Sequence, residues 1–103
     1  MVRGLVFLIA LVVAGTAALH ARAADARRGE SLAQDHCASC HIVAPHSRNE
    51  VADAPPFEVI ARKYGFDAGA IAQAIAGPHR KMNFSPNPAA AADIAAYIAT
   101  LGR

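Results

Sequence analysis

Two cysteines and a histidine form the most chemically specific segment of the sequence. The run Cys37-Ala38-Ser39-Cys40-His41 contains both cysteines of the chain, and the histidine directly follows the second one. The spacing C-x-x-C-H is that of c-type haem attachment, in which two thioethers join the cysteines to the porphyrin and the histidine binds iron. We therefore predict one covalently attached haem c, held by Cys37, Cys40 and His41.

Three other kinds of site also use closely spaced cysteines. A thioredoxin-type redox pair requires a βαβ setting, and the sequence has no strand-like alternation of apolar and polar residues. A zinc site requires about four ligands, and the chain has no second cysteine pair. A disulfide between Cys37 and Cys40 would close a very short loop and would stabilise the fold little. These alternatives stay open, although the sequence supports each of them less well than haem attachment.

The first 23 residues have the layout of a secretory signal peptide. Arg3 provides a positive charge, residues 5–14 are uninterruptedly apolar, and Ala21-Arg22-Ala23 offers an A-x-A cleavage site. The apolar stretch ends near Leu19, which makes it shorter than the ~20 residues that a helix needs to span a bilayer. We predict cleavage after Ala23 and a periplasmic mature domain, residues 24–103, without a membrane span. An uncleaved N-terminal anchor is the alternative.

The composition of residues 24–103 limits both the core and the function. Eight basic residues balance eight acidic ones, and 20 of the 39 hydrophobic residues are alanine. Domains this small with so few large apolar side chains usually need a disulfide, a metal or an apolar cofactor. The length excludes a two-domain enzyme, and the zero net charge argues against nucleic acid as a partner.

Apolar periodicity and capping residues predict an all-α fold of four helices joined by long loops. In so small a domain, long loops without a cofactor to pack against are unusual, so the loops also favour haem. Four helices are predicted. The first is residues 26–36 after an Asp25 N-cap, and the second is a short helix through Tyr64 with Pro56 in its first turn. The third lies between an Asp67 N-cap and Gly77, and the last runs from Pro88, after an Asn87 N-cap, to about Leu101.

In these features residues 25–101 resemble the small class I bacterial cytochromes c. The C-x-x-C-H run is the most specific element of the resemblance. Gly29 lies eight residues before Cys37, where in this family the N-terminal helix crosses the C-terminal one; an incidental glycine is the alternative. Tyr97 resembles the aromatic residue of the last helix that meets the N-terminal helix. The resemblance implies the cytochrome c fold, with about four helices wrapped around one covalent haem.

Met82 is the only methionine in residues 24–103, and it stands among charged and polar residues rather than on an apolar helical face. The resemblance implies that a methionine in this loop is the second axial ligand of the iron, opposite His41. The chain departs from the family pattern at Asn83, where a proline usually follows the ligand methionine. His79 is the main alternative ligand.

Other residues are expected to support the site. His36 and His46 are weaker candidates for the sixth ligand. In the family a proline carbonyl accepts a hydrogen bond from the ligand histidine, and Pro55, with Phe57 two residues later, fits this pattern best. Pro45 and Pro56 are alternatives, and each of these prolines could instead only shape a loop. The aromatic side chains are expected to wall the haem, namely Phe57, Tyr64, Phe66, Phe84 and Tyr97.

The resemblance implies a one-electron carrier rather than an enzyme. Its expected partners are a donor dehydrogenase or reductase and an acceptor oxidase or other enzyme, and we expect a monomer that docks through the haem edge. Zero net charge predicts weak steering overall, although Arg80-Lys81 could act locally. Asn83 and His79 motivate one alternative, a small-ligand sensor or peroxidase with a labile sixth site. An electron-transfer subunit of a larger oxidoreductase is the other.

Overall fold

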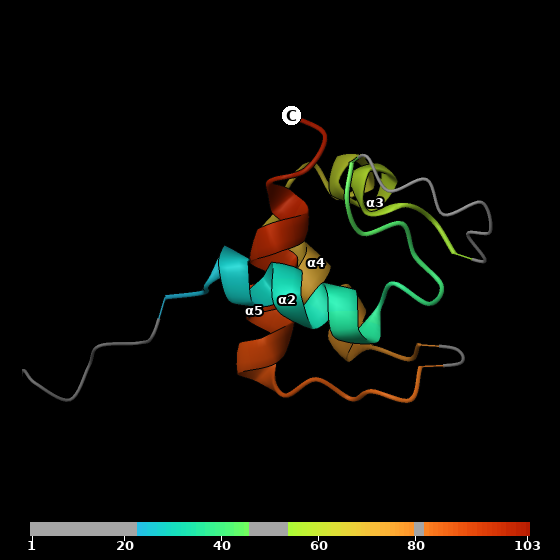
Figure 1. Ribbon diagram of the computed structural model, residues 1–103. Coiled ribbons are helices and arrows are strands. Elements are labelled where there is room, and N and C mark those ends of the chain that lie inside the picture. Colours follow the sequence, from blue (N-terminus) through green and yellow to red (C-terminus); the bar gives the residue numbers. More distant parts are fainter. Residues whose placement is uncertain (1–22, 46–53, 80–81) are drawn as a thin grey trace, which may run out of the picture.

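The computed structural model describes residues 23–45, 54–79 and 82–103, and these residues form four α-helices (Figure 1). In the order of the chain the helices are α2 (Ala26–His36), α3 (Phe57–Lys63), α4 (Ala68–Ala76) and α5 (Pro88–Ala99). The described ranges contain no strand, which confirms the predicted all-α class.

Some of the predicted features lie outside the described residues. They are residues 1–22 of the predicted signal peptide, His46, and the Arg80-Lys81 pair. Within the described ranges, no helix is long and apolar enough to cross a membrane.

The predicted N-caps are present at three of the helices. Asp25, Asp67 and Asn87 each accept a hydrogen bond from a backbone N–H in the first turn of the following helix, at 2.8 to 3.2 Å. Pro88 occupies the first turn of α5, where its missing N–H leaves no helical hydrogen bond unmade. Caps of this kind stabilise a helix by about 1 kcal/mol each, because they satisfy donors that the helix itself cannot.

Three predicted helix ends are wrong by one or two residues, namely the start of α3, its end, which lies at Lys63 with Tyr64 as the C-cap, and the end of α5. Pro56 is the N-cap of α3 rather than part of its first turn, because its backbone is extended, with ψ of 148°. The last helix ends at Ala99 rather than Leu101. There the Thr100 hydroxyl donates to the Tyr97 carbonyl at 2.6 Å, and Gly102 adopts a left-handed backbone with φ of 72° that turns the chain away from the helix axis.

Helices α2 and α5 cross with their backbones in contact at Gly29. A Cβ atom placed on Gly29 would lie 1.8 Å from the Asp93 carbonyl oxygen and 2.9 Å from the Ile94 nitrogen. No side chain fits there, so the glycine is required in spite of its cost of about 1 kcal/mol within a helix. The predicted close crossing at Gly29 is thereby confirmed, and the incidental glycine is excluded.

A buried carboxylate joins the start of α2 to the middle of α5. Asp93 is 3% exposed, and its Oδ1 accepts a hydrogen bond from the Asp25 backbone N–H at 2.7 Å. Its Oδ2 lies 3.7 Å from the Arg28 guanidinium, whose side chain is half exposed. A buried carboxylate is retained only where hydrogen bonds and charge offset its loss of water, and Asp25 and Arg28 provide such partners from the N-terminal end of α2.

The core is built around α5, which contacts each of the other three helices (Figure 1). The apolar stripe of this helix and its following turn is buried, namely Ile94, Tyr97, Ile98 and Leu101. Among the described residues, the largest fully buried side chains are those of Ile71, Ile94 and Ile98, and several other core positions are alanine. The helices therefore pack closely at one side of the domain and leave a large hollow beside them.

Replacing Gly29 with Ala tests the crossing. Helix propensity alone favours alanine by about 1 kcal/mol, whereas the collision with the α5 backbone forces the helices apart and is expected to destabilise the holoprotein by about 2 kcal/mol or more. Denaturant unfolding measures the difference. Gly69→Ala is the matched control, since its Cβ would meet only the Asp67 carboxylate, at 3.2 Å, and its expected change is about 1 kcal/mol or less. Equal effects of the two substitutions would contradict the close crossing.

Candidate functional site

The C-x-x-C-H run forms a tight turn at the end of α2. The Ala33 carbonyl accepts the N–H groups of both Cys37 and Ala38, at 2.8 and 3.1 Å, and so ends the helix. The Cys37 carbonyl then accepts the N–H groups of Cys40 and His41, at 3.2 and 2.9 Å. These bonds wind the backbone through one further turn, which brings the two thiols and the imidazole to the same cavity.

Both cysteines are free and partly buried. Burial raises the pKa of the Cys37 thiol above its ordinary value. The attacking cysteine of a redox-active C-x-x-C pair has the opposite property, a lowered pKa that makes it a thiolate near neutral pH. The environment of Cys37 therefore argues against the thioredoxin-like alternative and suits a thiol that becomes a thioether.

The His41 ring is oriented by the backbone of the segment before α3. Its Nδ1 lies 2.6 Å from the Pro55 carbonyl oxygen. A carbonyl oxygen can only accept, so Nδ1 carries the proton of the neutral ring and Nε2 keeps a lone pair for a metal. Of the three prolines considered from the sequence, Pro55 is the one whose carbonyl meets His41.

Two peptide hydrogen bonds hold this arrangement in register. The Ala54 N–H donates to the Cys40 carbonyl at 3.1 Å, and the Phe57 N–H donates to the Ile42 carbonyl at 3.0 Å. The Phe57 ring lies beside the imidazole, with ring centroids 5.3 Å apart. His41 is thus fixed by main-chain groups on either side of the Pro55 contact, and its orientation depends little on mobile side chains.

A cavity of about 870 Å³ lies next to these residues. Its volume falls within the range of cofactor sites in proteins, roughly 300–1,000 Å³. Cys37, Cys40, His41 and Met82 all line it. Much of the remaining wall is apolar, including Phe57, Ile60, Ile71, Ile75, Ile94 and Ile98. Two thiols, an oriented imidazole, a thioether and an apolar wall fit a covalent haem in size and in chemistry.

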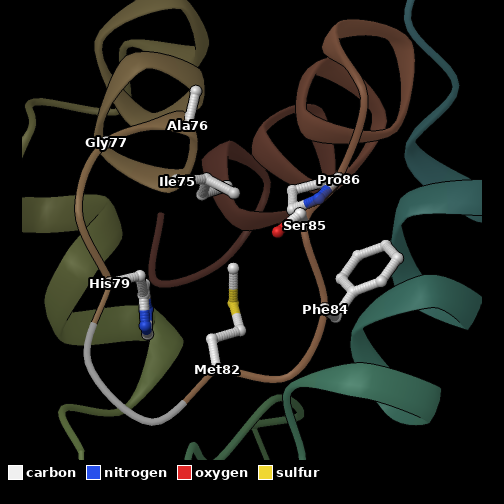
Figure 2. Close-up of a pocket in the computed structure, with 8 residues that line it drawn as sticks. All are labelled: Ile75, Ala76, Gly77, His79, Met82, Phe84, Ser85 and Pro86. Carbon is white, nitrogen blue, oxygen red and sulfur yellow. The ribbon is translucent and has the colours of Figure 1, made fainter.

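Met82 reaches this cavity from the segment between α4 and α5. Figure 2 shows its side chain pointing into the space between His79 and Phe84, below Ile75. These residues also line a smaller hollow of about 130 Å³ at the end of α4, continuous with the large one through shared lining residues. The structure therefore brings Met82 to the same cavity as His41, in agreement with the placement expected of a second axial ligand.

The rival histidines occupy different positions. The His79 ring lies in the cavity with its centroid 6.0 Å from that of His41, so His79 is also within reach of a group bound to His41. His36, the last residue of α2, also lines the cavity, and its ring stacks on Phe84 with centroids 3.8 Å apart and an interplanar angle of 5°. One face of the His36 ring is therefore covered by Phe84.

The expectation that all five aromatic residues wall the cofactor is wrong for two of them. Phe57, Tyr64 and Phe84 line the cavity, whereas Phe66 and Tyr97 do not. The Phe66 ring lies beneath the Arg103 guanidinium, 5.2 Å away. The Tyr97 ring packs edge-on behind Phe57, with centroids 6.4 Å apart, and so supports the wall from within the core.

Tyr97 also fastens the segment that follows His41. Its hydroxyl donates to the buried Val43 carbonyl at 2.5 Å. Burial, and secondarily the negative charge of Glu30, raises the pKa of the Tyr97 phenol. The sequence indicated an aromatic contact for Tyr97, but it carried no signal for this hydrogen bond, for the His36–Phe84 stack or for the buried Asp93.

Comparison with known proteins gives one informative relative. The chain is 40% identical over 100 residues to cytochrome c-552 of Bradyrhizobium diazoefficiens, and the match covers 96% of this chain and 93% of that protein. No family model and no solved structure matches the chain.

Replacing Tyr97 with Phe tests the hydrogen bond to Val43. The variant leaves a buried carbonyl without its donor, so we expect it to lose about 1–3 kcal/mol of stability at neutral pH. Because the folded-state pKa of Tyr97 is raised, its stabilisation is complete below the ordinary pKa of 10.0 and is lost as the pH rises through the folded-state pKa. The stability difference between the two proteins should therefore shrink above pH 10.0.

Denaturant unfolding of both holoproteins at neutral and alkaline pH measures this difference. Tyr64→Phe is the matched control, because the Tyr64 hydroxyl makes no hydrogen bond within the described part of the chain. A difference that stays constant between neutral pH and pH values well above 10.0 would contradict the assigned origin of the Tyr97 pKa.

Proposed function

Because this chain belongs to the small c-type cytochromes, electron-transfer proteins with covalently bound haem c, we propose that it is an exported carrier that uses His41 and Met82 as the two axial iron ligands. The observation that carries this proposal is the large cavity lined by Cys37, Cys40, His41 and Met82. The haem supplies the one-electron chemistry when bound, and the polypeptide sets its environment.

Each of these side chains has a separate task. Cys37 and Cys40 tether the cofactor through thioethers at the end of α2. His41 presents Nε2, because Nδ1 is held by the Pro55 carbonyl at 2.6 Å. Met82 offers a thioether sulfur, a ligand that together with histidine raises the reduction potential. Phe57, beside His41, helps to exclude water from this face.

The proposed partners are redox proteins that dock transiently at the cavity mouth. A dehydrogenase or reductase would deliver the electron, and an oxidase or other enzyme would accept it. Residues 24–103 carry eight basic and eight acidic side chains, so we expect association rates to depend weakly on salt. We propose export from the signal-peptide layout of residues 1–23, and we place the carrier in the periplasm as a monomer.

His79 supports a second candidate function. Its ring lies 6.0 Å from the His41 ring, so that it could replace Met82 or leave the sixth position labile. A protein with a labile sixth position would bind small ligands, as a sensor or a peroxidase does. The two functions therefore differ in which residue holds the iron opposite His41.

Replacing Met82 with Ala distinguishes these functions. If Met82 is the ligand, the ferric variant loses the Met–iron charge-transfer band, and its reduction potential falls by on the order of 0.1 V. His79→Ala is the matched control from the same loop and should keep both the band and the potential. A band that survives in Met82→Ala, or that is absent from the wild-type protein, would sink the proposed ligation. Visible spectra and redox titration of the purified holoproteins provide the readouts.

Substitutions in the C-x-x-C-H run test the attachment. We expect Cys37→Ala or Cys40→Ala to reduce pigmented protein severalfold, because each removes one thioether, and His41→Ala to abolish a stable holoprotein. Pigment yield per unit of exported polypeptide is the measurement, and Ser39→Ala, which leaves all three groups intact, is the control. Normal pigmented yield from His41→Ala would contradict the assigned role.

A further inference from the structure

The segment that carries Met82 is not held by secondary structure. Residues 82–87 form neither helix nor strand. Within the described chain, residues 82–86 make no hydrogen bond to other residues. Asn83 follows Met82, so no proline ring limits the backbone angle directly after the proposed ligand. Side-chain packing must therefore keep this segment against the rest of the domain.

One such contact is the stack of Phe84 on His36. The two rings lie face to face, with centroids 3.8 Å apart and planes within 5° of parallel. Phe84 is two residues after Met82, and His36 is the last residue of α2, next to Cys37. The stack thus joins the Met82 segment to the helix end from which the haem-attachment turn begins.

The arrangement of the side chains follows from this contact. The Phe84 side chain extends from the Met82 segment toward α2, while the Met82 side chain points into the cavity (Figure 2). The stack can form only while the segment lies against α2, and this is the position from which Met82 reaches the cavity shared with His41. The stack therefore stabilises the conformation in which Met82 lies in the cavity relative to one in which the segment has moved away from α2.

We propose that His36 is a positioning residue that, through its stack on Phe84, holds Met82 on the iron. This inference rests on the proposed ligation by Met82 and adds a role for a cavity-lining residue that is neither a proposed iron ligand nor a point of covalent haem attachment. Pairs of stacked rings contribute enough to change an equilibrium about two- to tenfold. Loss of the stack should weaken the binding of Met82 to iron by that factor and leave the cofactor attached.

Titration of the ferric holoprotein with imidazole measures this equilibrium, because imidazole binds the iron only when Met82 has left it. Its apparent Kd falls by the factor by which the population without bound methionine rises. We expect His36→Ala and Phe84→Leu each to lower this Kd about two- to tenfold. The double variant should lower it no further than either single variant, because both remove the same contact.

Two controls separate positioning from general destabilisation. His36→Phe keeps a flat ring for the stack and should restore the Kd to within about twofold of the wild-type value. Gln34→Ala changes an exposed side chain near the same end of α2 and should leave the Kd unaltered. Denaturant unfolding identifies a variant whose fold is damaged, and Phe84→Leu then provides the independent test.

The outcomes distinguish this inference from the ligation on which it rests. A wild-type ferric protein without the Met–iron band refutes the ligation and the inference together. A wild-type protein that has the band, combined with an unchanged Kd in folded His36→Ala and Phe84→Leu, refutes the positioning role alone. Additive effects in the double variant, or failure of His36→Phe to restore the Kd, also overturn it.

Discussion

The backbone contact between α2 and α5 at Gly29 is the constraint on which the rest of the structure depends. It brings the α2 backbone directly against the Asp93 carbonyl, and the Asp93 carboxylate ties the start of α2 to the same place. The far end of α2 then leads into the cysteine turn, and α5 provides Ile94 and Ile98 to the cavity wall. A change in the distance between the two helices would therefore move the attachment turn relative to the wall it faces.

The histidine side of the site is held mainly by main-chain groups. The Pro55 carbonyl accepts from His41, the Cys40 carbonyl accepts a backbone hydrogen bond from Ala54, and the Val43 carbonyl accepts one from the Tyr97 hydroxyl. Carbonyl acceptors persist through most substitutions, so this geometry tolerates sequence change. The methionine side differs, because described residues 82–86 depend on packed side chains rather than on backbone hydrogen bonds. The two proposed axial ligands are thus supported by different kinds of interaction.

Features with local causes could be predicted from the sequence. The caps at Asp25, Asp67 and Asn87 act within one turn of their helices, and the C-x-x-C-H run is contiguous. Local sequence therefore predicts both the caps and the haem-attachment motif. Apolar periodicity extends α5 beyond its true end, because the Thr100 hydroxyl competes with helix continuation and periodicity does not register this effect. Pairings between distant residues, such as Asp93 with Asp25 or His36 with Phe84, leave no pattern in either segment alone.

The hydrogen bond from Asp25 to Asp93 spans 68 positions of the chain and joins its first described helix to its last. Contacts so distant in sequence close a large loop, and they form late because the intervening chain must first be available. A polypeptide that still lacks α5 lacks the helix against which α2 packs, even though the N-cap of α2 is already present. We propose that this chain is exported. Because α5 is synthesised after the other described helices, folding is delayed, and the chain stays unfolded and able to pass through a translocation channel until α5 has been made.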